Sequence, residues 1–142
     1  MKLIAVLVGA AVSLVISSCA TAPKPLASGE LRLSSVRLPE KEDIKVNTPF
    51  LVAISFEADG EPDIRAACFY FSGDGPYCSK VTDVIYGSPG MIKVETRTRY
   101  SGSFHLGCYV RYIRDGKMQE TNEVGSHFHA STQGTFQPTP KR

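Results

Sequence analysis

Three cysteines in the body of the chain could form a disulfide bond: Cys68, Cys78 and Cys108. Cys68 and Cys78 flank the segment 72–76, Ser-Gly-Asp-Gly-Pro, whose residue types favour a tight turn. A hairpin centred on Gly73 would place these two cysteines opposite one another. Cross-strand Cβ atoms lie about 4.5–5.5 Å apart, and closest at positions without hydrogen bonds, which approaches the separation of a disulfide. No Cys-x-x-Cys motif is present, so we expect no redox role.

Three histidines are candidate ligands of a metal ion. His127 and His129 are two residues apart on an expected strand, so they share a face, about 6.6–6.8 Å apart along the backbone. His105 lies on the neighbouring expected strand, and Glu123 shares the face of His127 and His129. Two histidines at this spacing can bind copper or zinc, whereas the simpler interpretation is solvent-facing residues near a strand end. We expect no metal and no other cofactor, and keep a metal-binding protein as an alternative.

Catalytic motifs do not stand out in this chain. No Gly-x-Ser-x-Gly segment lies between a strand and a helix, as a hydrolase nucleophile elbow requires. The glycine-rich segments 73–75 and 87–90 are typical of turns, because neither Lys-Ser/Thr nor a helix follows them. Glu40, Glu42 and Asp43 lie in a charged loop, where carboxylates are usually solvated. We therefore expect a protein that is not an enzyme.

Aromatic residues and an arginine suggest a contact surface for another protein. Strict alternation puts Phe69 and Phe71 on the strand face opposite Cys68. Tyr109 and Arg111 join this face if their strand lies alongside. Exposed aromatic residues and arginine are what protein interfaces favour. The sequence predicts that Phe69, Phe71, Tyr109 and Arg111 bind a partner; the alternative is that a bulge or the N-terminal spacer covers them.

The start of the chain has the pattern of a secretory signal. A lysine after the initiator methionine precedes the apolar segment 3–16 and a pair of serines. Residues 16–19, Ile-Ser-Ser-Cys, resemble the lipobox of bacterial lipoproteins. This resemblance implies that Cys19 is acylated, begins the mature chain and anchors it in the membrane, since two or more acyl chains hold a protein stably. In that family an aspartate at the next position favours the inner membrane, so Ala20 points to the outer membrane, facing the periplasm.

Two other interpretations of the N-terminus are weaker. A plain signal peptide would leave the position of Cys19 to coincidence. An uncleaved membrane helix needs about 20 apolar residues, and the apolar stretch is too short. In the oxidising periplasm that the lipoprotein signal implies, a disulfide is expected.

The expected organisation is a lipoprotein signal peptide over residues 1–18, a flexible tether over 19–30, one folded domain over 31–130 and a disordered tail over 131–142. Small residues and prolines in the tether and the tail cannot bury apolar surface. The 142-residue chain has a formal net charge of +2, or +1 without Lys2. This near balance argues against a nucleic-acid partner.

Alternating hydrophobicity predicts an all-β domain. The clearest period-two segments are 50–57, 92–98 and 104–112, and weaker segments are 31–38, 64–71, 81–86 and 118–128. Turn-forming glycine, proline and aspartate separate them, and no apolar stripe of helical period occurs. Seven short strands with such turns indicate one antiparallel β-sandwich.

Residues 101–110, Ser-Gly-Ser-Phe-His-Leu-Gly-Cys-Tyr-Val, resemble the start of strand F in immunoglobulin-like and fibronectin-III-like domains. Arg-Asp-Gly-Lys at 114–117 would form the hairpin that follows. The resemblance covers about residues 31–130. It implies a single immunoglobulin-like antiparallel β-sandwich of about seven strands.

The antibody hallmarks are absent from this chain. It has no tryptophan, and Leu106 rather than tyrosine precedes Cys108 by two. Segment 50–57 has no cysteine, so the inter-sheet bridge of antibodies is impossible. The resemblance makes the strands of Cys68 and Cys108 neighbours. A Cys68–Cys108 bridge, or no bridge among these residues, therefore stays open beside Cys68–Cys78.

These features together predict a lipid-anchored interaction or structural module of the cell envelope. The membrane is contacted through the lipid, and an envelope protein is the expected partner. The alternatives are a periplasmic metal-binding protein that uses the surface histidines and a small cell-envelope enzyme. Neither the partner nor a small-molecule ligand can be identified from the sequence.

Overall fold

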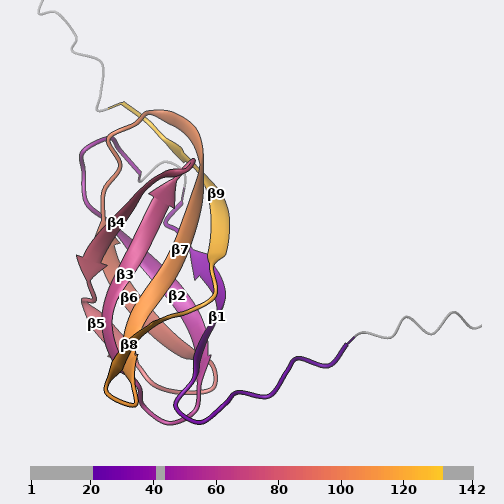
Figure 1. The fold of residues 1–142 in the computed structure, drawn as a ribbon. Helices are drawn as coiled ribbons and strands as arrows, with labels where there is room; N and C mark the ends of the chain where they lie inside the picture. Colours follow the sequence, from indigo (N-terminus) through magenta and orange to yellow (C-terminus); the bar gives the residue numbers. More distant parts are fainter. Residues whose placement is uncertain (1–20, 41–43, 133–142) are drawn as a thin grey trace, which may run out of the picture.

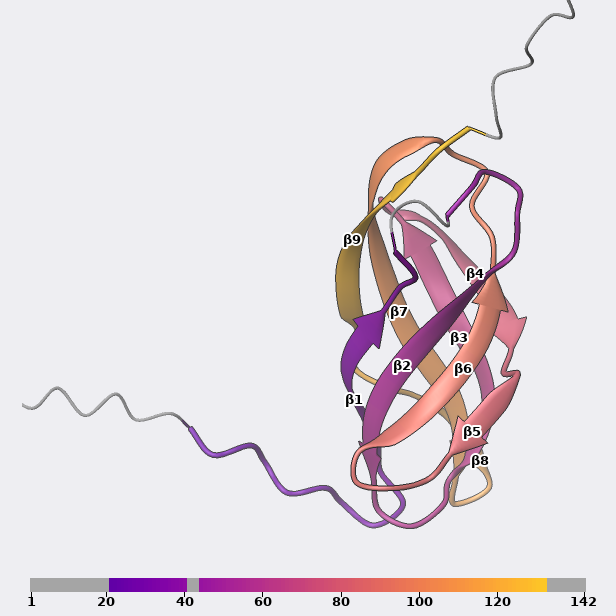
Figure 2. The same ribbon diagram turned by 180° about the vertical axis from the view of Figure 1, so that it is seen from behind.

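The computed structural model describes residues 21–40 and 44–132, and all of its regular elements are strands. They form two antiparallel sheets that face each other across one core, which confirms the all-β prediction (Figures 1 and 2). One sheet has the order β1-β2-β6-β5; the other has the order β4-β3-β7-β8, with β9 also paired to β7. The strands are β1 (Leu31–Arg37), β2 (Phe50–Ala58), β3 (Asp63–Phe71), β4 (Asp74–Lys80), β5 (Asp83–Ile85), β6 (Gly90–Thr96), β7 (Gly102–Arg114), β8 (Lys117–Glu120) and β9 (Val124–Ala130). In this described part, no helix is long and apolar enough to span a membrane.

The structure has nine strands rather than the expected seven, for two local reasons. First, the segment 118–128 divides into β8 and β9, which pair with different halves of the long β7. Second, β4 occupies residues that the turn-forming types had assigned to a loop. Only Ser72 and Gly73 form the turn between β3 and β4, with φ of 50° and 89°. Two central residues with positive φ are typical of the type I′ turn that joins twisted strands.

The core lies between the inward faces of the two sheets. The first sheet contributes the alternate residues predicted for β2 and β6, with Val52, Ile54, Ile92 and Val94 fully buried. The second sheet contributes Ala67, Phe69 and Phe71 of β3 and alternate residues of β7. Burial of these aliphatic and aromatic side chains is the main stabilising term of such a fold.

One edge of the molecule is closed where β1 lies beside β9 (Figures 1 and 2). The side-chain amide of Asn122 satisfies both backbone groups of Leu33: its Oδ1 accepts from the N–H and its Nδ2 donates to the C=O, both at 2.9 Å. Further along, the Ser131 N–H donates to the Ile44 C=O, and the Val46 N–H donates to the Ser131 C=O, both at 3.0 Å. The segments that follow β1 and β9 therefore bond to each other directly on this side.

The opposite edge is formed by β4 and β5, which leave it partly open. The chain runs along β4 in one sheet and then crosses to the other sheet as the three-residue β5 (Figures 1 and 2). β5 pairs only with residues 91–93 of β6. Within the described part of the chain, no strand is hydrogen-bonded to the remainder of β6 on this side.

Candidate functional site

Phe69 and Phe71 lie in the core and not on the outer face that strict alternation predicts. Phe69 is fully buried, Phe71 is 4% exposed, and both belong to the central hydrophobic cluster. The pairing of β3 with β7 shifts register between Ile64 and Ala66, so Arg65 lies in a bulge. Because of this extra residue, the side chains of β3 that face the core have odd residue numbers after the bulge, not even ones. The predicted exposed position of Phe69 and Phe71 is therefore wrong.

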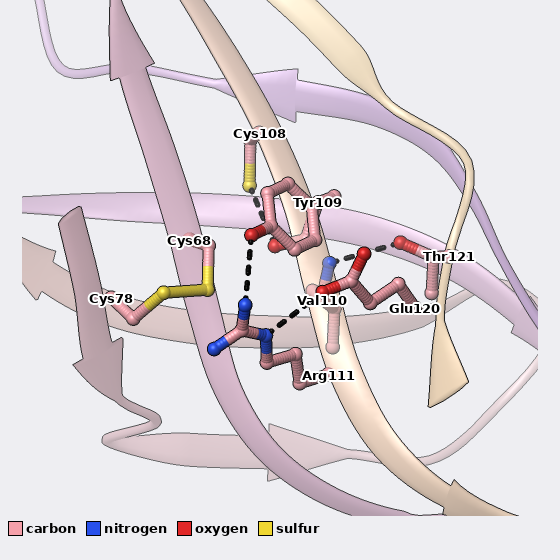
Figure 3. The surroundings of a disulfide bond; sticks show 8 residues. All are labelled: Cys68, Cys78, Cys108, Tyr109, Val110, Arg111, Glu120 and Thr121. Atoms are coloured by element: carbon pink, nitrogen blue, oxygen red, sulfur yellow. Dashed lines mark hydrogen bonds and ion pairs between the residues drawn. A yellow bond between two sulfur atoms is a disulfide. The ribbon is translucent and has the colours of Figure 1, made fainter. Parts of the chain in front are cut away.

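Tyr109 and Arg111 lie on the outer face of their sheet, next to the disulfide and on the opposite face from Phe69 and Phe71 (Figure 3). Tyr109 is nevertheless buried, with 8% of its surface exposed. The Arg111 Nε donates a hydrogen bond to Glu120 at 3.0 Å, and a terminal nitrogen of Arg111 donates to the Tyr109 hydroxyl at 3.3 Å. The guanidinium carbon also lies 5.8 Å from the centre of the Tyr109 ring. The guanidinium is thus engaged by neighbours within the domain. Partner binding by Tyr109 and Arg111 stays a prediction.

The Cys68–Cys78 disulfide is confirmed (Figure 3). The two residues are directly opposite in the β3–β4 ladder, with Cα atoms 4.0 Å apart, as the hairpin argument predicted. Cys108 pairs with Phe69 in the neighbouring ladder and faces the core, so it is free and buried. Burial, and then the negative charge of Glu123, raises the pKa of the Cys108 thiol to about 12. Cys108 is therefore a protonated core residue at neutral pH and not a nucleophile.

Two of the three histidines come together on the outward face. His105 and His127 are directly opposite in the β7–β9 ladder, and their ring centres are 5.0 Å apart. His129 instead lies with its Nδ1 3.3 Å from the Ser103 hydroxyl. Within residues 21–40 and 44–132, no group of three or more His, Cys, Asp or Glu side chains is arranged to hold a metal ion. The pair could supply two imidazole ligands to copper or zinc, with the remaining ligands from elsewhere.

A pocket of about 210 Å³ opens at the edge between β4 and β6, and the sequence did not predict it. We call it the edge pocket. Three of its lining residues are aromatic and three are charged: Phe71, Tyr77, Tyr100, Glu95, Arg97 and Arg99. Phe71 is the buried floor, while Tyr77 and Tyr100 are 42% and 44% exposed.

The tyrosines of the edge pocket are held in place by Asp74. Both hydroxyls donate to the same carboxylate oxygen, Tyr77 at 2.7 Å and Tyr100 at 2.8 Å. The bond from Tyr77, and then that from Tyr100, lowers the pKa of Asp74, while the carboxylate raises the pKa of both phenols. The two rings come from β4 and from the segment after β6, so the carboxylate connects the two sides of the edge pocket.

The arginines of the edge pocket have unused hydrogen-bond donors. In the described part of the chain, neither Arg97 nor Arg99 forms a hydrogen bond or an ion pair within 4 Å, although Arg99 is close enough to lower the pKa of Asp74. Among the described residues that line the edge pocket, Glu95 is the one carboxylate, against two guanidinium groups, and Asp74 lies behind the two tyrosines. A guanidinium group offers five N–H donors in a planar fork that matches a carboxylate. The edge pocket can therefore bind a carboxylate beside an aromatic floor.

Part of this site was visible in the sequence. The alternation of segment 92–98 correctly put Arg97 on the outward side of its strand. The edge pocket itself depends on β4 lying beside β6, and β4 begins within the segment 72–76, whose residue types favour a turn.

No protein-family model matches the chain, and no curated protein matches it significantly. The expected lipidation residue, Cys19, lies outside the described residues.

Proposed function

We propose that this protein is a lipid-anchored, non-catalytic binding module of the cell envelope, with an immunoglobulin-like sandwich as its folded domain. The lipobox-like segment that ends at Cys19 supports the anchor, and Ala20 supports an outer-membrane position facing the periplasm. The strand orders support the immunoglobulin-like assignment. They correspond to A-B-E-D and C′-C-F-G when β1 is taken as strand A and β8 and β9 together as strand G.

The edge pocket is the observation that supports a binding function. It combines a buried aromatic floor, tyrosines positioned by Asp74 and two arginines that have no hydrogen-bond or ion-pair partner among the described residues. A concave, largely preformed site with a few polar groups is what ligand and partner sites usually share. Aromatic residues and arginine are also the side chains that contribute most to binding energy at protein interfaces.

Site-specific crosslinking in intact envelopes tests this function. A photoreactive amino acid at Ser79, which lines the edge pocket, should give a discrete adduct. The same group at Ser34, exposed on β1 at the far edge of the molecule, should not. Equal adducts at both positions, or none at Ser79, would contradict the proposal. In the same cells, palmitate should label the wild type and not Cys19→Ser.

Metal binding is kept as a second candidate because of one observation, the 5.0 Å separation of the His105 and His127 rings. Titration with copper(II) should then show a site that is lost in His105→Gln and kept in His129→Gln. Identical titrations of the three proteins would eliminate this candidate. No contact in the described residues favours the envelope enzyme.

A further inference from the structure

The free edge of β6 beside the edge pocket presents unpaired backbone groups. The Thr82 N–H donates to the Lys93 C=O on the β5 side, whereas the Thr98 C=O accepts a hydrogen bond on the β2 side. Backbone groups of successive residues in an antiparallel strand point to alternate sides. Glu95 in β6 therefore directs its N–H and C=O groups to the side where β5 has already ended, and the bond at Thr98 indicates the same direction for Arg97, one residue beyond β6. No other strand of residues 21–40 and 44–132 pairs with them there.

A strand added at this position would have two different faces. Thr96 is buried and faces inward, whereas Arg97 and Arg99 are exposed. Alternate side chains of the added strand would therefore lie next to the two arginines. The side chains between them would enter the edge pocket over Phe71 and Tyr77.

We infer that the edge pocket binds an extended peptide with alternating acidic and apolar side chains, added as a strand to β6. The inference rests on the proposed binding function and names its ligand. Addition of a peptide strand to an exposed sheet edge combines backbone hydrogen bonds for affinity with side-chain pockets for selectivity. Charge complementarity specifies the acidic positions as those opposite Arg97 and Arg99. The negative charge of Glu95 disfavours an acidic residue at the peptide position opposite Glu95.

A small carboxylate is the competing occupant of the edge pocket. Such an ion would satisfy the guanidinium groups of Arg97 and Arg99. It would leave the backbone groups of Glu95 and Arg97 without a partner other than water. The peptide uses all of these features at once, so the observations favour it.

A designed peptide tests the inference directly. The probe is acetyl-Thr-Val-Glu-Val-Glu-Val-Thr-amide carrying a fluorescent dye, titrated with the full chain and followed by anisotropy. Its sequence is symmetric, so the test does not depend on strand direction. Replacing both glutamates with glutamine should weaken binding about tenfold, because two charge-assisted contacts are lost. The variant Arg97→Gln/Arg99→Gln should bind the two peptides equally.

Matched controls separate the specific effect from net charge and from unfolding. Arg37→Gln/Arg65→Gln removes the same charge from exposed positions on β1 and β3, away from the edge pocket, and should keep the preference for glutamate. Thermal unfolding of both double variants should match the wild type, because all four side chains are exposed.

Backbone methylation of the probe tests the strand geometry. In an added strand that runs antiparallel to β6, as every strand pair of this sheet does, the amides of the two glutamates would face β6. The amides of the valines would then face away. N-methylation of both glutamates should abolish binding, whereas N-methylation of two valines should preserve it. Equal effects of the two modifications would overturn strand addition, as would succinate competing as well as the peptide. Failure of every peptide while Ser79 still forms its crosslink would refute this ligand and leave the proposed function standing.

Discussion

The two edges of this molecule are built in opposite ways. At the β1–β9 edge, the amide of Asn122 satisfies both backbone groups of Leu33, and Ser131 bonds to both Ile44 and Val46. At the β4–β6 edge, no strand of the described residues is hydrogen-bonded to β6 beyond Lys93 on the β5 side, and a pocket lies between β6 and β4.

This difference indicates which edge of the domain has hydrogen-bond groups available to a ligand. Hydrogen-bond groups that are satisfied within the fold stabilise it and are not available to a ligand. The same reasoning distinguishes the arginines: Arg111 bonds to Glu120 and Tyr109, whereas Arg97 and Arg99 have no such partners within residues 21–40 and 44–132. We therefore assign stability to the closed edge and binding to the open edge.

The largest expected effect concerns the core that both edges share. Phe69→Ala should lower the free energy of unfolding by about 3–5 kcal/mol, the usual range for a fully buried phenylalanine. The matched variant Tyr70→Ala, on the outward face of the same strand, should cost much less. Urea unfolding of both proteins measures the difference. A larger loss for Tyr70→Ala would contradict the orientation of β3.

The disulfide should be the next most important element, because it holds β4 in place at the open edge. Cys68→Ala/Cys78→Ala should lower the free energy of unfolding by roughly 2–3 kcal/mol in the loop-entropy model. The same variant should also weaken peptide binding, since Tyr77 of β4 lines the edge pocket. Reduction of the wild type is the control and should shift the urea midpoint similarly. An unchanged midpoint after complete reduction would show that β4 does not depend on the bridge.

Asn122→Ala tests the closed edge. It leaves two backbone groups of the buried Leu33 without their partners, which should cost about 2 kcal/mol. Ser79→Ala at the open edge is the matched control and should change stability by less than about 0.5 kcal/mol. Thermal unfolding compares the two variants. Equal losses would remove the contrast between the edges.

The smallest effect concerns the acid titration of Asp74. Hydrogen bonds from Tyr77 and Tyr100 hold its pKa below the ordinary value of 3.8, so the folded state favours the carboxylate. This contribution is fully present above pH 3.8 and is lost as the pH falls through the lowered pKa. Carbon-detected NMR should show Asp74 titrating below an ordinary aspartate, and Tyr77→Phe/Tyr100→Phe should bring its pKa back up. An ordinary pKa in the wild type would mean that the tyrosines are not held.

Local patterns in the sequence predicted much of the fold. Alternation identified β2, β6 and most of β7, and the Asp115-Gly116 turn between β7 and β8 has the positive φ values of 51° and 73° that its residue types favour. The turn at Gly73 also predicted the disulfide partner correctly. These features depend only on neighbours along the chain.

The errors came from information that local patterns do not contain. The bulge at Arg65 reverses the faces of β3, yet it is defined only by the register with β7. The edge pocket forms only because β4 and β6, from different sheets, lie side by side. The Gly75-Pro76 pair within β4 is typical of a turn, so the sequence does not predict a strand that begins there. The predicted surface shared by Phe69, Phe71, Tyr109 and Arg111 therefore does not form, and the edge pocket was not predicted.

Amide hydrogen exchange at the free edge of β6 tests the central claim most directly. In the free protein, the amides of Glu95 and Arg97 should exchange faster than those of Val94 and Thr96, which face β2. Saturation with the glutamate peptide should slow exchange at Glu95 and Arg97 at least tenfold, because the added strand accepts their hydrogen bonds. Unchanged exchange at these two amides in the saturated complex would contradict the account, even if the peptide binds.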